Sequence, residues 1–172
     1  MNSQQKQASA IPVIAYVALG SNLEDPQNQV RQGFDALEDL PNSKLLACSS
    51  LYLSKPVGYL DQPDFINAVA KLETSLPPRD LLDALLAIEF KYGRKRSTPN
   101  APRTLDLDVL LYNGLQHDEA GLTIPHPRMH TRAFVLLPLT EIDPDCEIPG
   151  QGLAKDWLLR IEGQQQQIGK LT

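Results

Sequence analysis

The sequence has little cysteine, a single tryptophan and no apolar run long enough to span a membrane. Its two cysteines, Cys48 and Cys146, lie far apart with no histidine at metal-ligand spacing. We read them as small buried hydrophobic residues in a reducing compartment. Residues 1–10 are polar, rich in Gln and Ser, and lack the apolar segment of a secretory signal. We therefore expect a cytoplasmic protein with no membrane partner, in which residues 1–10 form a disordered tail.

The chain also lacks the surplus of basic residues expected of a nonspecific nucleic-acid binder, because its net charge is −5 over 172 residues. Charge is nevertheless uneven: the segment from Lys91 to Arg103 holds five basic residues and no acidic one. A basic island in an acidic chain indicates a specific anionic ligand. The alternative is an ordinary solvated basic loop.

The two common glycine-rich phosphate motifs are absent, both the G-x-x-x-x-G-K-[ST] loop and a G-x-G-x-x-G run after a strand. A polyphosphate would therefore have to be held by arginine side chains and a metal ion. Guanidinium groups grip phosphate in forked pairs. The available arginines are Arg94, Arg96, Arg103, Arg128 and Arg132.

Hydrophobic patterning predicts one domain over residues 11–172, with the order strand, helix, strand, strand, helix, strand, followed by C-terminal additions. Two β-α-β halves in this order predict an α+β fold, a ferredoxin-like βαββαβ antiparallel sheet with both helices on one face and the other face free. Pro26, after a capping Asp25, and Pro78 mark the helix starts. The remaining expected elements are strands at 11–19, 44–54 and 65–74, a strand through 106–112, and later helices at 131–139 and 154–161.

The segment Pro102–Tyr112 contains two aspartates separated by one leucine. Side chains alternate along a strand, so Asp106 and Asp108 share one face. Adjacent carboxylates repel each other unless a cation lies between them, and hard oxygen ligands suit Mg²⁺. The alternative is a half-exposed strand with two solvated acids.

A second candidate group lies at the start of the 65–74 strand, where Phe65 and Asn67 share the face opposite the apolar one. Such a pair can stack on and hydrogen-bond a planar heterocycle; the alternative is an exposed strand end. His126 stands between two prolines and is either a phosphate donor or acid, or a structural histidine.

Four motifs together resemble the 6-hydroxymethyl-7,8-dihydropterin pyrophosphokinases of folate biosynthesis. They are Ala18–Leu23, Asp61–Asn67, Pro102–Asp108 and Ile124–Pro127, in family order and spacing, within a resemblance over about residues 13–160. The resemblance implies transfer of the pyrophosphoryl group of ATP to the hydroxymethyl group of a reduced pterin, with release of AMP. It also implies two Mg²⁺ ions on Asp106 and Asp108, flexible loops that close over the substrates, and the ferredoxin-like fold.

The resemblance further assigns residues to the two substrates and to catalysis. Those matching the pterin pocket are Ser54, Lys55, Val57, Phe65, Asn67 and Phe134. Those matching the ATP side are Glu89, Arg94, Arg96, Arg103, Thr123, His126 and Arg132, with Arg94, Arg103, Asp106 and Asp108 as the catalytic set.

The sequence departs from the commonest family pattern near the expected ATP site. Asn100-Ala101 stand where an Arg-Trp-Gly run is frequent, and Phe65 stands where tyrosine is frequent. Gly121 and Pro127 occupy places of an arginine and a tyrosine in some members. We expect these changes to affect loop closure and nucleotide grip, and not the reaction.

Two other functions are compatible with the same elements. A regulatory module would use the sheet face for a small effector, but it has no need for two aspartates beside a basic loop. A metal-dependent nucleotidyl transferase would release pyrophosphate in place of AMP. Nothing in the sequence requires more than a monomer.

Overall fold

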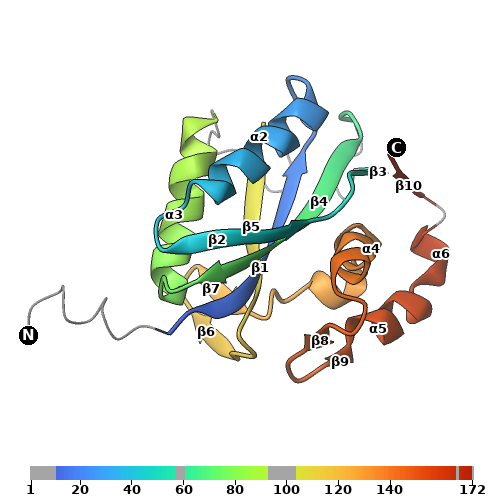
Figure 1. Ribbon diagram of the computed structural model, residues 1–172. Helices are drawn as coiled ribbons and strands as arrows, with labels where there is room; N and C mark the ends of the chain where they lie inside the picture. Colours follow the sequence, from blue (N-terminus) through green and yellow to red (C-terminus); the bar gives the residue numbers. More distant parts are fainter. Residues whose placement is uncertain (1–10, 57–60, 93–103, 166, 172) are drawn as a thin grey trace, which may run out of the picture.

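The computed structural model describes residues 11–56, 61–92, 104–165 and 167–171. A mixed α/β architecture is built on one twisted antiparallel sheet with helices on both sides (Figure 1). The strands follow the order β10-β3-β4-β1-β5, and β2 also pairs with β4. Their bounds are β1 Val13–Ser21, β2 Ser43–Cys48, β3 Tyr52–Ser54, β4 Phe65–Thr74, β5 Asp106–Tyr112 and β10 Ile168–Lys170.

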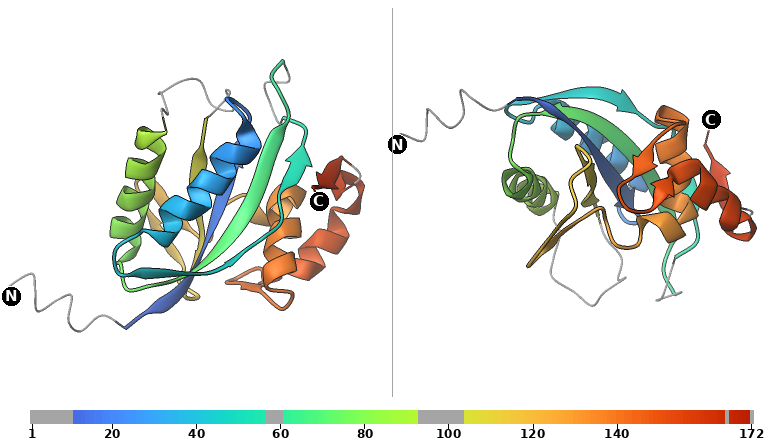
Figure 2. Two further views of the ribbon diagram at one scale, coloured as in Figure 1. Left: turned by 45° about the horizontal axis from the view of Figure 1, so that its top comes forward. Right: turned by 90° about the horizontal axis from the view of Figure 1, so that it is seen from below.

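The first face of the sheet is covered by α2 (Pro26–Glu38) and α3 (Pro78–Lys91), as the views in Figure 2 show. Both helices begin at the proline that the sequence indicated, because proline at the first helical position loses no needed hydrogen bond. Asp25, however, makes no side-chain cap; it has a φ of 61° and accepts the Gln29 N–H through its backbone oxygen. The apolar side chains of both helices join those of β1, β4 and β5 in the first core cluster.

The expected strand 44–54 is divided into β2 and β3 by a break at Ser49. Ser49 donates its N–H to the Val69 carbonyl, and its Oγ accepts the Val69 N–H, both at 2.9 Å. The Ser49 hydroxyl therefore accepts a hydrogen bond that a backbone carbonyl would accept in a regular pair of strands. After this break, the side chains of β3 point to the faces opposite to those that continuous alternation predicts. Leu53 is 38% exposed, whereas Tyr52 and Ser54 are buried.

The second face is not free, contrary to expectation. It carries the 3₁₀ turn η1 (Met129–Thr131), α4 (Ala133–Ile142) and α5 (Ala154–Arg160), which cover one end of the face. A second apolar cluster fills that end, with Val69 and Leu110 from the sheet against Leu136 and Leu139 of α4. The opposite end of this face stays polar.

A carboxylate on α4 fixes the helix to the sheet edge. Glu141 accepts the Ser50 N–H at 2.8 Å, the Ser50 hydroxyl at 2.6 Å and the Tyr52 hydroxyl at 3.0 Å, and it pairs with Lys170 of β10 at 3.3 Å. The sequence patterns missed β10, which extends the sheet beyond β3.

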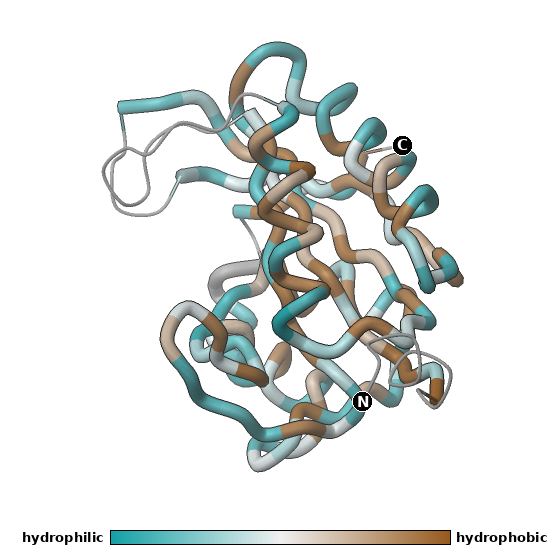
Figure 3. The backbone as a smooth tube through the Cα atoms, turned by 90° about the vertical axis from the view of Figure 1, so that its left-hand side faces the viewer, coloured by the Kyte–Doolittle hydropathy of each residue, from teal (hydrophilic) through white to brown (hydrophobic). Residues whose placement is uncertain are grey.

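The remaining elements are short and lie at the periphery. The Asn113-Gly114 turn, with φ of 47° and 68°, follows β5 as the sequence predicted. The segment after it forms a hairpin of β6 (His117–Glu119) and β7 (Leu122–Ile124), which we did not predict. The other short elements are β8 Glu147–Ile148, β9 Gly152–Leu153 and α6 Glu162–Gln165. In Figure 3 hydrophobic residues, in brown, recur along the elements at the centre of the view. None of the helices in the described part of the chain has the length and hydrophobicity needed to cross a bilayer.

Candidate active site

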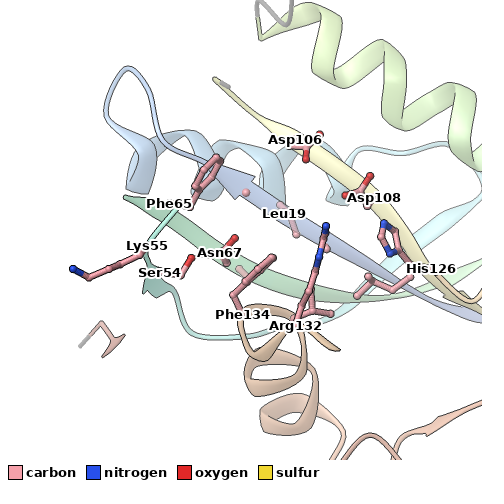
Figure 4. A pocket seen from close by; sticks show the side chains of 15 residues that line it. Leu19, Ser54, Lys55, Phe65, Asn67, Asp106, Asp108, His126, Arg132 and Phe134 are labelled. Atoms are coloured by element: carbon pink, nitrogen blue, oxygen red, sulfur yellow. Dashed lines mark hydrogen bonds between the residues drawn. The ribbon is translucent and has the colours of Figure 1, made fainter. Parts of the chain in front are cut away.

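A pocket occupies the polar end of the second sheet face, between the strand ends and the N-terminus of α4 (Figure 4). It brings together residues from β4, β1 and β5, from the end of β3 and from the segment 126–135. Its lining consists of Ala18, Leu19, Gly20, Ser54, Lys55, Phe65, Asn67, Ala68, Asp106, Asp108, Leu110, His126, Arg132, Phe134 and Val135.

The two aspartates of β5 line this pocket, and both are half-buried. They lie opposite Gly20 and Ala18 of β1, whose small side chains leave space above the sheet. Leu107, between them, points the other way into the first core cluster. The alternation expected from the sequence is therefore confirmed at this strand.

The two carboxylates do not form a complete metal cage. Among the described residues, no cluster of three or more His, Cys, Asp or Glu side chains is arranged to hold an ion. An ion on Asp106 and Asp108 would take its remaining ligands from water or substrate oxygens. This donor set fits Mg²⁺, which keeps several waters and binds through one or two carboxylates plus substrate phosphates.

The opposite side of the pocket combines an aromatic ring with a fixed amide. Phe65 and Asn67 begin β4, and Asn67 is 6% exposed. Its Nδ2 donates to Ser54 Oγ at 2.6 Å, so the amide is held against β3. Its Oδ1 stands 3.4 Å from the place where a Cβ on Gly20 would be, so a side chain there would press on the amide.

Phe134 and Arg132 approach from the N-terminus of α4, as Figure 4 shows. The guanidinium carbon of Arg132 lies 5.4 Å from the centre of the Phe134 ring. Burial and the neighbouring Arg128 lower the pKa of Arg132, while Asp108 and Asp106 oppose that shift. An arginine remains charged nonetheless, so the pocket carries a partly desolvated cation facing two carboxylates.

His126 is held beside the same carboxylates by backbone contacts. Its backbone N–H donates to the Leu110 carbonyl at 2.9 Å, and its ring Nδ1 accepts the Arg128 backbone N–H at 3.2 Å. Burial and the charge of Arg132 lower the pKa of His126 to about 4, against a weaker opposing effect of Asp106. The ring is therefore neutral at pH 7, and because Nδ1 is an acceptor, Nε2 carries the proton and can donate it to a ligand oxygen.

The loop before β4 is attached to the end of β1. The Asn22 side chain donates to Gln62 Oε1 at 2.7 Å and to the Pro63 carbonyl at 3.0 Å. The Ser21 hydroxyl donates to the Thr104 carbonyl, just before β5. These bonds fix the entry points of the strands that carry Phe65 and the aspartates.

Not every expected site residue lies in this pocket. Glu89 is on α3, behind β5, and its Oε1 accepts the Leu107 N–H at 2.7 Å. Thr123 is exposed on β7 and donates to Asp118 Oδ1 at 3.0 Å. Lys55 lines the pocket rim with its amine pointing outward (Figure 4). Four further expected residues, Val57, Arg94, Arg96 and Arg103, lie outside the described residues.

Sequence reasoning missed several residues that shape the pocket without polar chemistry, among them Ala18, Gly20, Leu110 and Val135. Strand alternation could have found the first three, because they lie on the same face as Asp108. Val135 had no such signal, because its position depends on how α4 packs on the sheet.

A family model described as 7,8-dihydro-6-hydroxymethylpterin-pyrophosphokinase (HPPK) matches residues 16–144 of the chain. Two relatives named 2-amino-4-hydroxy-6-hydroxymethyldihydropteridine pyrophosphokinase give the same result. That of Pseudomonas aeruginosa is 52% identical over 134 residues, 78% of this chain and 83% of the relative. That of Haemophilus influenzae is 50% identical over 137 residues, 80% of this chain and 86% of the relative.

Solved structures of Plasmodium falciparum HPPK-DHPS share the fold at low sequence identity. One, a triple mutant with pteroate, has a TM-score of 0.73 at 13% identity and is matched by 94% of this chain. This chain spans only 47% of that longer protein, so the likeness concerns the shared fold alone.

Proposed function

The chain belongs to the 7,8-dihydro-6-hydroxymethylpterin-pyrophosphokinase family, and from this premise we propose the reaction that its pocket carries out. The protein is a pyrophosphokinase of folate biosynthesis. It transfers the pyrophosphoryl group of ATP to the hydroxymethyl oxygen of 6-hydroxymethyl-7,8-dihydropterin, giving AMP and the pterin pyrophosphate. The observation that carries this proposal is the convergence of a carboxylate pair and an aromatic-amide pair on one pocket.

The transfer has a simple atom balance. The hydroxymethyl oxygen attacks the β-phosphorus of ATP, and the bond from that phosphorus to the α–β bridging oxygen breaks. AMP leaves with the bridging oxygen, and the hydroxyl proton passes to water, so no protein base is required. Phosphoryl chemistry of this kind depends on positioning and charge neutralisation.

The carboxylate end of the pocket suits the triphosphate. Asp106 and Asp108 would hold two Mg²⁺ ions, which neutralise phosphate charge when bound. Arg132 supplies a further cation, and neutral His126 donates its Nε2 proton to a phosphate oxygen. We also assign Arg94, Arg96, Arg103 and Thr123 to the ATP side from the family resemblance, with Arg94 and Arg103 acting in catalysis. Glu89, which the resemblance also placed there, is buried behind β5 and is left out of this set.

The aromatic end suits the pterin. The ring lies between Phe65 and Phe134, and the oriented amide of Asn67 hydrogen-bonds its polar edge. Ser54, Lys55 and Val57 complete this part of the site. The hydroxymethyl group then points along the sheet toward the carboxylates, where transfer occurs.

We propose a ferredoxin-like βαββαβ core for the fold, with the segments after β5 as C-terminal additions. The strand order β3-β4-β1-β5 and the two helices on the first face support this assignment. We further propose one domain over 11–172, a monomer and a cytoplasmic location; the expected tail, residues 1–10, lies outside the described residues.

One experiment tests the reaction directly. The protein is incubated with ATP, Mg²⁺ and 6-hydroxymethyl-7,8-dihydropterin, and the nucleotide products are resolved by chromatography. AMP that forms only when the pterin and Mg²⁺ are both present is expected. Release of pyrophosphate in place of AMP would indicate a nucleotidyl transferase, and no turnover by folded protein would favour a binding module.

A further inference from the structure

The inner stripe of α3 contains a buried acid where packing alone calls for a leucine. Leu81, Leu85 and Glu89 follow at intervals of four residues, and all three are buried. This is the spacing of one helix face turned toward a core. A carboxylate in such a place is costly unless it is hydrogen-bonded, so Glu89 must serve a purpose other than filling space.

One hydrogen bond of Glu89 is made at the residue between the two expected metal ligands. Its Oε1 accepts the Leu107 N–H at 2.7 Å, and Leu107 separates Asp106 from Asp108. The strand order of the described sheet ends at β5. The Glu89 carboxylate therefore accepts the hydrogen bond that the carbonyl of a neighbouring strand would otherwise accept from Leu107.

Anchoring this N–H fixes the directions of both aspartates. The Leu107 nitrogen belongs to the peptide unit that joins Asp106 to Leu107, and Asp108 is the next residue along the strand. Mg²⁺ requires nearly octahedral geometry, and groups that orient its ligands affect its affinity strongly. An edge strand that shifts or twists would misplace both carboxylates together.

We propose that Glu89 is a positioning residue that sets the geometry of the Asp106–Asp108 pair for divalent-cation binding, from the opposite side of β5. This inference rests on the proposed metal role of those two aspartates. It differs from a direct contact with ATP, because Glu89 belongs to the buried face of α3 and does not line the pocket.

The test measures cation binding without turnover. Mn²⁺ is titrated into the full chain with α,β-methylene-ATP, in which the bond to be broken is replaced, and free Mn²⁺ is followed by electron paramagnetic resonance. Glu89→Leu keeps the packing volume but removes the acceptor, and we expect it to raise the Mn²⁺ Kd about tenfold or more. Glu89→Gln keeps an acceptor oxygen, so its Kd should stay within about threefold of wild type.

Two controls separate positioning from folding and from the metal assignment. Leu81→Ala creates a cavity in the same helix stripe, so it should lower the Tm but leave the Mn²⁺ Kd unchanged. Glu89→Leu leaves the Leu107 N–H without this acceptor, so it should also lower the Tm, but unlike Leu81→Ala it should raise the Mn²⁺ Kd. If Asp108→Ala has the same Mn²⁺ Kd as wild type, the proposed metal site is wrong. If Asp108→Ala binds Mn²⁺ more weakly but Glu89→Leu has the same Mn²⁺ Kd as wild type, only the role of Glu89 is overturned.

A measurement on the unmodified protein covers the case in which Glu89→Leu does not fold. We expect the Leu107 amide to exchange with deuterium at least ~100-fold more slowly than an unprotected amide, although it lies on an edge strand. Free exchange at Leu107 would show that the anchoring bond is absent in solution and would overturn the proposal.

Discussion

Helices cover both faces of the sheet, but they cover the first face fully and the second face only at one end. On the first face, α2 and α3 extend over the strands, and the side chains between them form one apolar cluster. On the second face, α4 and α5 cover one end only. The polar pocket occupies the other end, where Asn67 and the two aspartates project.

This difference separates stability from chemistry along the same strands. In β5, Leu107 is 2% exposed in the first core, whereas its neighbours Asp106 and Asp108 line the pocket. In β4, Ile66 belongs to the first core and Asn67 faces the pocket. A one-residue change of register would exchange the two sets, so the apolar face also determines where the functional side chains point.

The largest expected contrast compares two adjacent residues of β5. Asp108→Ala should lower kcat/KM by at least ~10³-fold in the AMP assay, because a ligand of the phosphate-bound ions is lost. Its urea unfolding curve should match that of wild type. Leu107→Ala should instead cost about 2–5 kcal/mol of unfolding free energy. Wild-type activity in Asp108→Ala would show that the metal assignment is wrong.

The next contrast lies within the pocket. Phe65→Ala should weaken pterin binding about tenfold, because a stacking surface is removed, and leave binding of an ATP analogue within about twofold. Calorimetric titration with each ligand separately measures both values. Phe90→Ala is the matched control, because Phe90 is 80% exposed on α3 and lies outside the pocket. If binding of both ligands is weakened equally, Phe65 does not belong to the pterin site.

A smaller effect tests how the second-face helices are attached. Glu141→Gln removes the charge that accepts bonds from Ser50 and Tyr52, and we expect a loss of about 1–2 kcal/mol in unfolding free energy. Glu119→Gln is the control, because Glu119 pairs with Arg79 at the surface, and surface pairs contribute little. Equal stability of Glu141→Gln and wild type would mean that apolar packing alone holds α4.

The smallest effect concerns pH and His126. Its folded pKa is about 4, below the ordinary value of 6.5, because of burial and Arg132 and Arg128, with Asp106 opposing. Between these values the unfolded state binds the proton and the folded state does not, so stability falls as the pH is lowered from 6.5 toward 4. Metal-free wild type should lose about 1 kcal/mol more than His126→Asn between pH 7 and 5.5. Parallel pH profiles of the two proteins would contradict this expectation.

The sequence allowed the parts that depend on local signals to be predicted. Pro26 and Pro78 mark the starts of both first-face helices, and β4 begins at Phe65 and ends at Thr74 as its alternation indicates. The shared face of Asp106 and Asp108 also follows from alternation. These features require only neighbouring residues.

The features that could not be predicted depend on contacts between distant residues. The strand break at Ser49 is formed with Val69, twenty residues later. The cover over half of the second face depends on α4 packing against Val69 and Leu110. The position of Glu89 beneath the aspartates depends on how α3 lies against β5, which helical spacing alone cannot give.

The single tryptophan gives the molecule a built-in optical reporter. Trp157 on α5 meets the His130 ring edge-on at 4.7 Å, and its indole N–H donates to the Gln151 carbonyl at 2.8 Å. His130 belongs to the short segment that joins His126 to Arg132. Substrate binding that shifts this segment would therefore change the emission of one unlabelled chromophore, at a known place, with no competing indole elsewhere in the sequence.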